Sequence, residues 1–346
     1  MAISEPSWWY DTAPRWQTIV LRPAARIYGV LAARRLSSGN AYRSRCPVIC
    51  VGNFTAGGTG KTPAALAVAG IVRGLGGAPV FLTRGYGGRL AGPVEIDPKR
   101  HGFADTGDEP LLLAETAPTI IAKDRAKGAA LIDRTASDNT VIIMDDGLQN
   151  PTLVKDLSIA LIDAKRGFGN GAVIPAGPLR APIDAQIALA DCVIVNGDPT
   201  ARELDAIAAA LPRLHAGLMR ARVVPAPGSE ALAGKRVVAF AGIANPKRFF
   251  DLVDRLGADV RETVVFADHH AFSEADAGRL LALAGKAGAS LVTTQKDLVR
   301  LRGLANGGEL VSRTTALPIK LELLDDDRKR LTALIESRMK ARRAQP

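Results

Sequence analysis

A glycine-rich segment beginning at residue 55 has the residue types of a phosphate-binding loop. Glycines allow backbone N–H groups to turn toward phosphate oxygens, and a helix N-terminus adds positive potential. Lys61 can reach the β- and γ-phosphates of a nucleotide, and the Thr62 hydroxyl can ligate Mg²⁺. Thr55 stands where the standard pattern begins with glycine. The predicted phosphate-binding residues are Thr55, Ala56, Gly57, Gly58, Thr59, Gly60, Lys61 and Thr62.

Two aspartates, Asp145 and Asp146, follow an apolar run that begins at Val141. An acidic residue at the end of a buried strand is the usual metal-binding partner of a phosphate loop. One aspartate can hold Mg²⁺ directly, while the other binds through water or orients Thr62. Paired aspartates at a strand end can also cap a turn, but the nearby glycine-rich segment favours a metal site.

Acid–base chemistry is suggested by two further clusters. Asp108 and Glu109 stand at the start of a predicted helix, and His269 lies in an Asp-His-His run at 268–270. Transfer of a phosphoryl group to a hydroxyl requires an acceptor for the hydroxyl proton. Asp108 is the candidate base, with His269 as a tuning or relay group, and Glu109 is a further candidate metal ligand. Arg84 follows an apolar run and offers a cation.

Strand-like and helix-like segments alternate from residue 46 onward. Alternation of this kind favours a P-loop NTPase-like α/β fold, with a mainly parallel sheet and helices on both faces. Strands are predicted at 47–53, 79–83, 119–122, 141–145, 158–163 and 192–196, and a second alternating set runs from 236 to 323. A Gly/Pro-rich stretch near 225 separates the two sets. We therefore expect a P-loop domain at 46–225 and a smaller C-terminal α/β domain at 226–346.

Residues 1–45 are predicted to form an amphipathic, membrane-associated helix. All three tryptophans fall within the first sixteen residues, and seven arginines face only Glu5 and Asp11 over this range. Tryptophan and arginine beside an apolar stripe are typical of a helix that lies in a membrane surface. An amphipathic helix packed on its own domain is the alternative. The residues expected to face the membrane are Trp8, Trp9, Trp16, Arg22 and Arg26.

The composition limits the partners and the compartment. A net charge of +10 and a pI near 9.8 require an acidic partner, such as nucleic acid, an anionic membrane or a phosphorylated substrate. Three cysteines without a CxxC pair argue against a disulfide framework or a zinc site. No apolar run reaches the ~18 residues that span a bilayer, and the N-terminus lacks the pattern of a signal peptide. A cytoplasmic protein is expected.

Eight motifs together resemble the tetraacyldisaccharide 4′-kinase family of the lipid A pathway in Gram-negative bacteria. They occur in the family's order and cover most of the chain. The motifs are VGNFTAGGTGKTP (51–63), TRGYGG (83–88), GDEPLLLA (107–114), AKDRAKGA (122–129), MDDGLQ (144–149), GNGAVIPAGPLR (169–180), FADHHAF (266–272) and TTQKDLVRL (293–301).

This resemblance implies ATP- and Mg²⁺-dependent phosphorylation of the 4′-hydroxyl of an acylated glucosamine disaccharide 1-phosphate, giving the bis-phosphorylated lipid A precursor (lipid IVA). It implies that Asp108 and His269 form a catalytic pair and that Arg84 and Arg180 lie at the site. It further implies peripheral attachment to the cytoplasmic face of the inner membrane. Two positions depart from the family pattern: Ala181 replaces a glutamate, and Asn150 replaces a histidine.

Three rival classes are less consistent with the sequence. A membrane-recruited switch of the MinD/ParA type would carry a lysine where Ala56 stands. A GTPase would carry Asn-Lys-x-Asp after a strand, and Thr294–Asp297 does not match it. A nucleic-acid-binding surface would need stacking aromatics that are scarce beyond residue 110. We therefore expect a monomer that acts on a lipid and does not bind nucleic acid.

Overall fold

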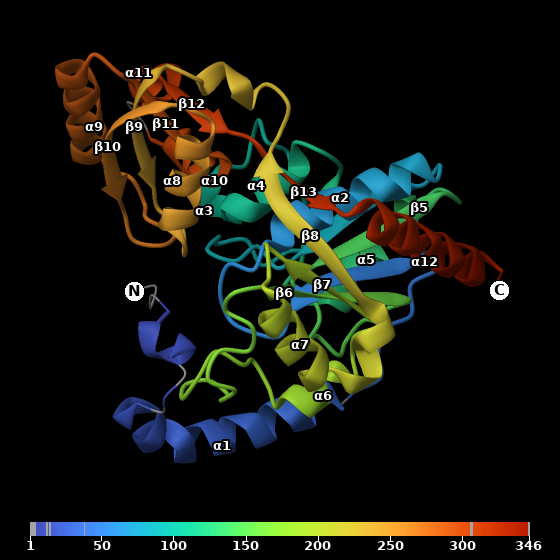
Figure 1. The fold of residues 1–346 in the computed structure, drawn as a ribbon. Coiled ribbons are helices and arrows are strands. Elements are labelled where there is room, and N and C mark those ends of the chain that lie inside the picture. Colours follow the sequence, from blue (N-terminus) through green and yellow to red (C-terminus); the bar gives the residue numbers. More distant parts are fainter. Residues whose placement is uncertain (1–4, 12, 14, 38, 305–306, 345–346) are drawn as a thin grey trace.

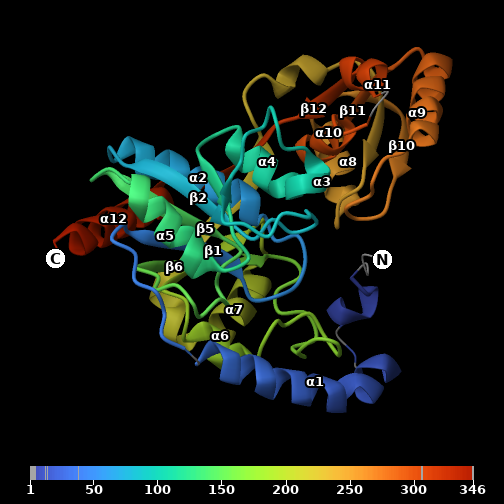
Figure 2. The ribbon, with the colours of Figure 1, turned by 180° about the vertical axis from the view of Figure 1, so that it is seen from behind.

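Two β-sheets organise the computed structural model, which describes residues 5–344 except 12, 14, 38, 305 and 306, and only the backbone at 215 and 216. The larger sheet has nine strands and the smaller has four (Figures 1 and 2). In sheet order the nine strands are β13 (Ile319–Leu323), β8 (Leu218–Pro225), β7 (Cys192–Asn196), β6 (Leu157–Asp163), β1 (Val48–Asn53), β5 (Thr140–Asp145), β2 (Ala78–Thr83), β4 (Thr119–Ile121) and β3 (Val94–Glu95).

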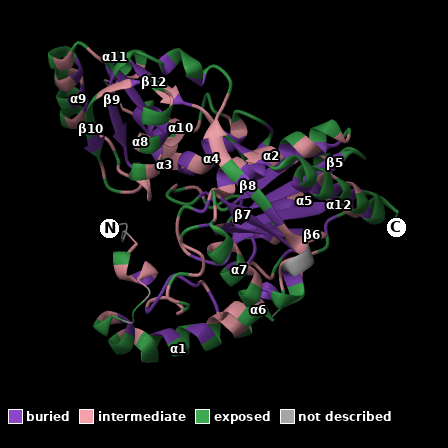
Figure 3. Ribbon diagram, viewed as in Figure 1, coloured by how far each residue is buried: buried purple, intermediate pink, exposed green. Residues whose placement is uncertain are grey.

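The larger sheet is parallel except at its two edges, where β3 pairs with β4 and β13 pairs with β8 in the antiparallel sense. Every residue of β1 and β5 is buried, as expected for apolar strands covered on both faces (Figure 3). Helices α2 (Lys61–Gly74), α4 (Asp108–Ala114) and α12 (Asp325–Arg343) contribute to the core on one face. Helices α5 (Arg125–Thr135), α6 (Ile183–Ile187) and α7 (Ala201–Ala210) contribute to the cores on the other.

The smaller sheet is entirely parallel, in the order β10 (Asp259–Val265), β9 (Arg236–Ala241), β11 (Ser290–Thr294) and β12 (Thr314–Leu317). Helix α8 (Pro246–Arg255) packs on one face. Helices α9 (Glu274–Ala287), α10 (Gln295–Leu301) and α11 (Gly308–Ser312) contribute to the core on the other. The mainly parallel α/β architecture predicted from the sequence is confirmed.

The chain does not divide at residue 225 as simply as the sequence predicts. The predicted C-terminal domain begins at 226, but β13 pairs with β8 in the larger sheet and α12 packs in its core. Two features of this region were not predicted from the sequence. Strand β8 runs into the Gly/Pro-rich stretch that was predicted to separate the two sets, and Pro318 separates β12 from β13. The tail therefore lies with the first domain, because these apolar residues complete that sheet.

Helix α1 (Trp16–Leu36) lies along the lower edge of the molecule in Figure 1. It turns small residues inward, with Ala25 and Gly29 buried. Its large apolar residues point outward instead, and those exposed are Trp16, Ile19, Val20, Ile27, Tyr28, Val30 and Leu31. Within the part of the chain that the structure describes, no helix is both long and apolar enough to cross a bilayer.

Remaining short elements connect these units. They are the 3-10 helices η1 (Ser7–Tyr10), η2 (Pro212–Gly217) and η3 (Ser229–Leu232), and helix α3 (Phe103–Thr106).

Candidate active site

The glycine-rich segment joins the end of β1 to the start of α2, the position that a phosphate-binding loop requires. Gly57 and Gly60 have φ angles of 101° and 93°, which favour glycine. The loop is fixed from inside: Asn53 Nδ2 donates to Thr59 Oγ1 (3.2 Å), and Asn196 Nδ2 donates to the Thr59 carbonyl (2.8 Å). Lys61 Nζ lies 3.5 Å from the Gly57 carbonyl oxygen, folded over the loop. We call residues 55–62 the phosphate cradle.

The loop before α6 supports the cradle and supplies a cation. The Ala56 amide donates to the Pro178 carbonyl (2.8 Å), and Arg180 Nε donates to the Thr55 carbonyl (3.1 Å). Arg180 Nη1 also lies 3.0 Å from a carboxylate oxygen of Asp146. Arg180 therefore links the cradle to Asp146. Neighbouring Ala181 is buried.

Asp145 and Asp146 lie where β5 ends beside β1. Asp145 is buried, and neither of its carboxylate oxygens has a hydrogen-bond donor among the described residues. Burial, followed by the charges of Glu109 and Asp146, raises the pKa of Asp145 to about 7. Burial also opposes ionisation of Asp146, but Arg180 and Lys61 outweigh it and lower that pKa to about 2. A divalent cation would satisfy the bare oxygens of Asp145.

The residues present fit a magnesium ion that also contacts nucleotide phosphates. Thr62, the last residue of the cradle, is buried at the first turn of α2. The described residues contain no group of three or more His, Cys, Asp or Glu side chains able to hold a metal ion. Mg²⁺ is commonly bound by one or two carboxylates together with substrate phosphates and water, so this donor set is consistent with it.

Asp108 lies at the first turn of α4 and is enclosed by cations from the smaller sheet's domain. Its Oδ2 accepts from Arg300 Nε (2.9 Å) and from Arg300 Nη2, and His269 Nδ1 lies 3.4 Å away. Burial raises the pKa of Asp108, but His269, Lys296 and Arg300 outweigh burial and hold it well below its usual range. The hydrogen bond that His269 donates to Asp108 raises the pKa of His269 above its ordinary 6.5. The predicted pair is therefore in contact.

Glu109, predicted as a metal ligand, is engaged by Lys296, whose Nζ lies 2.6 Å from Glu109 Oε1. The charge of Lys296 lowers the pKa of Glu109. The charge of Glu109 also raises the pKa of Asp145. Its role as a ligand stays a prediction.

Sequence reasoning missed three basic residues, although all three stand in motifs quoted above. Lys296 and Arg300 come from TTQKDLVRL, and Arg125 from AKDRAKGA. Burial lowers the pKa of the Arg125 guanidinium, while the charges of Asp145 and Asp146 raise it. Arg84 is exposed and, among the described residues, has no hydrogen bond or ion pair.

One expectation about the membrane-facing residues is wrong. Trp9 is buried, its indole Nε1 donates to the Pro175 carbonyl (3.2 Å), and its own carbonyl accepts from the Asn170 amide (2.7 Å). The clustering of the tryptophans in the sequence predicted that all three face the membrane, but the Trp9 ring packs on the loop before α6. Trp16, Arg22 and Arg26 are exposed on α1, and Trp8 is half-buried; whether they contact a membrane stays a prediction.

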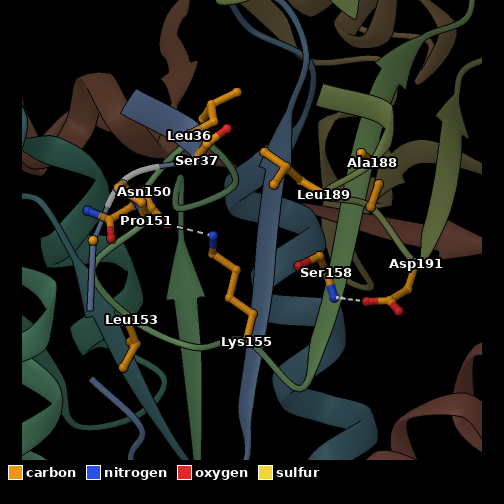
Figure 4. A pocket seen from close by; sticks show the side chains of 12 residues that line it. Leu36, Ser37, Asn150, Pro151, Leu153, Lys155, Ser158, Ala188, Leu189 and Asp191 are labelled. Atoms are coloured by element: carbon orange, nitrogen blue, oxygen red, sulfur yellow. Dashed lines mark hydrogen bonds between the residues drawn. The ribbon is translucent and has the colours of Figure 1, made fainter. Parts of the chain in front are cut away.

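A pocket lies apart from the cradle and from the Asp108–His269 pair. A pocket of about 390 Å³ opens beside Leu36, at the end of α1, and near Ser158 and Asp191, where β6 and β7 begin (Figure 4). Lys155 Nζ donates there to the Asn150 carbonyl (2.6 Å). The departure at Asn150 thus falls in this pocket rather than in the cradle.

A phosphate cradle, paired aspartates at the adjacent strand end and a buried aspartate paired with a half-buried histidine are typical of P-loop phosphotransferases. Comparison with known proteins is more specific. The family described as "LpxK: Tetraacyldisaccharide-1-P 4'-kinase" matches residues 17–340. The chain belongs to this family.

Individual relatives agree with this assignment. The protein named tetraacyldisaccharide 4'-kinase from Methylobacterium nodulans is 48% identical over 340 residues, covering 97% of this chain and 95% of the relative. Its namesake from Nitrobacter winogradskyi is 46% identical, covering 98% and 99%. A crystal structure of LpxK from Aquifex aeolicus, described as an "apo" form in complex with ATP, shares the fold, with a TM-score of 0.71 and 24% identity over 93% of this chain and 99% of that one.

Proposed function

We propose that this chain is an ATP-dependent kinase that phosphorylates the 4′-hydroxyl of tetraacyldisaccharide 1-phosphate, giving lipid IVA. Membership of the family supports the reaction. The observation that carries the proposal is that residues from both domains meet at one site. The cradle, Asp145 and Asp108 belong to the domain of the larger sheet, and His269 contacts Asp108 from the domain of the smaller sheet. Such a site can hold a triphosphate and a hydroxyl together.

Each part of the site has a distinct task in this proposal. The cradle amides and Lys61 bind and orient the ATP phosphates, and Arg84 and Arg180 are cations for the phosphate charge that accumulates during transfer. Thr62, Asp145 and Asp146 would hold Mg²⁺, which neutralises phosphate charge when bound. The Asp108–His269 pair accepts the proton of the sugar hydroxyl.

Helix α1 is proposed to attach the enzyme peripherally to the cytoplasmic face of the inner membrane. Its large apolar residues point outward, and Arg22 and Arg26 are exposed beside them. Apolar side chains enter the acyl boundary of a bilayer, and arginines meet anionic headgroups. A lipid substrate embedded in that bilayer would then be within reach of the site.

Transfer of labelled γ-phosphate from ATP to a tetraacylated disaccharide 1-phosphate in detergent tests the proposal. We expect labelled lipid from the wild type and none from Lys61→Ala, because Lys61 is the cradle's phosphate-binding cation. Glu203→Ala is the control, since Glu203 caps exposed helix α7. ATP hydrolysis stimulated by plain anionic vesicles, without lipid product, would contradict the kinase and indicate a membrane-recruited ATPase switch.

A further inference from the structure

The start of the chain lies directly against the phosphate cradle. A Cβ built on Gly57 would fall 1.6 Å from Glu5 Oε1, so this carboxylate rests on the backbone of the loop. Gly57 lacks the side chain that would keep Glu5 away. In Figures 1 and 2 the dark blue segment that contains Glu5 stands beside the loops at the carboxyl edge of the large sheet.

Several contacts hold this segment, residues 5–11, in place. Glu5 Oε2 accepts from Tyr10 Oη (2.9 Å) and from Arg166 Nη1 (2.9 Å), and the Arg166 guanidinium lies 4.7 Å from the centre of the Tyr10 ring. Trp9 is buried against the loop before α6, hydrogen-bonded to Pro175 and Asn170. That same loop supports the cradle through Pro178. The segment and the cradle thus share one support.

The other carboxylate oxygen of Glu5 has no hydrogen-bond partner within the part of the chain that the structure describes. Oε1 is buried and has no hydrogen-bond donor among the described residues, although it adjoins a loop built to bind anions. Although Oε2 is paired, a buried carboxylate oxygen without a donor is unfavourable, and its negative charge repels other anions nearby. ATP phosphates entering the cradle would meet this negative charge at Gly57.

We propose that residues 5–11 form a strap that closes the cradle in the nucleotide-free protein and is displaced when nucleotide phosphates bind. Glu5 blocks the cradle at Gly57, and Trp9 anchors the strap to the loop before α6. Phosphate oxygens would take the place of the carboxylate against the loop, and Arg166 would be released from Glu5. The inference rests on the proposed nucleotide site. It adds a conformational cost to ATP binding, because only the open form of the strap is competent to bind.

Tryptophan fluorescence can follow the strap, because the three tryptophans all lie within residues 1–16. A Trp8→Phe/Trp16→Phe variant keeps Trp9 alone. Adding ATP and Mg²⁺ should shift Trp9 emission to the red and increase its quenching by acrylamide. The half-saturation of both changes should match that of binding measured by calorimetry. Unchanged Trp9 emission at an ATP concentration that calorimetry shows to be saturating would overturn the proposal.

Variants of the strap give a second, independent test. Glu5→Ala should tighten ATP binding about tenfold, as expected if the competent population rises from about a tenth to nearly all. Trp9→Ala, which releases the anchor but keeps Glu5, should act in the same direction. Asp11→Ala is the matched control, since Asp11 pairs outward with Arg15 and should leave affinity unchanged.

The opposite result is equally informative. Weaker ATP binding in Glu5→Ala would show that Glu5 assists the nucleotide or its metal ion, and the strap would be excluded. If calorimetry detected no ATP binding in the wild type or in any variant, the cradle itself would be refuted, and with it the proposed function.

Discussion

Asp108 combines two properties that rarely coexist in one carboxyl group. It is buried, yet Arg300, Lys296 and His269 keep it ionised. Arg300 and His269 contact Oδ2, while Oδ1 accepts from the Glu109 amide (2.9 Å). Such a carboxylate is rigidly placed, which suits a group that must meet a hydroxyl in one geometry. Its proximity to His269 allows the proton to be shared by the pair.

Asp108→Asn should lower kcat by about 10²–10⁴-fold, the usual range for loss of a positioned base, with ATP affinity unchanged. Steady-state kinetics and calorimetry measure the two quantities. Glu115→Gln, at the other end of α4 in an exposed pair with Arg302, should leave both unchanged. A fall in ATP affinity with kcat preserved would instead give Asp108 a role in binding metal or nucleotide.

His269 should hold its proton to a higher pH than a free imidazole, because Asp108 raises its pKa above 6.5. The contribution of this pair to stability is then fully present below the unfolded-state pKa, and it is lost as pH rises through the raised folded-state pKa. NMR titration of the His269 ring measures the shift directly. In Asp108→Asn the raised pKa should fall back; a wild-type value at or below 6.5 would contradict the pairing.

Among the helices, α1 has the reverse of the usual burial pattern: its small residues are buried and its large apolar residues are exposed. Ala25 and Gly29 face the protein, where Gly29 lies close to Pro182, while Trp16, Ile27 and Leu31 face outward. A helix of a soluble domain normally buries its large apolar residues. The inversion is explained if a second apolar phase covers the outer face.

Replacing Trp16, Ile27 and Leu31 together by Gln should lower affinity for anionic vesicles by about 30-fold or more. Each large side chain contributes about 1.5–3 kcal/mol when fully buried, and even partial burial of three of them at the bilayer surface contributes about 2 kcal/mol in total. Vesicle flotation measures the change. Activity on detergent-dispersed lipid should be retained, since these side chains are remote from the cradle. Val265→Gln, an exposed apolar position on β10, is the control. Undiminished flotation of the triple variant would exclude α1 as the attachment.

For the whole molecule, the two sheets' domains are joined by buried charges at the active site. Arg300, fully buried, also donates to the Gly242 carbonyl (2.6 Å) and to Asp297 (2.8 Å). Its contact with Asp108 therefore ties α10 to α4, beside the contact between Lys296 and Glu109. The proposed catalytic pair and the cohesion of the two domains therefore depend on the same residues.

Arg300→Met should lower the free energy of unfolding by about 3–5 kcal/mol, because Asp108 would be left as an uncompensated buried charge. Adding Asp108→Asn should restore part of that loss. Urea unfolding measures all three proteins. Arg313→Ala, which breaks an exposed pair with Glu309, should cost under about 1 kcal/mol. A cost that small for Arg300→Met would mean that the buried pair does not hold the domains together.

The sequence by itself determined the cradle, the paired aspartates and the alternating strands and helices, because these depend on local spacing and on continuous apolar runs. Only the tertiary structure decided that β13 returns to the larger sheet, since strand pairing across about a hundred residues leaves no local pattern. It also separated Trp9, buried, from Trp16, exposed, although composition placed them in one membrane-facing group. The contacts of Glu5 with Gly57 and of Arg300 with Asp108 could not be predicted either. Contacts between distant segments are decided by packing, and spacing along the chain does not encode them.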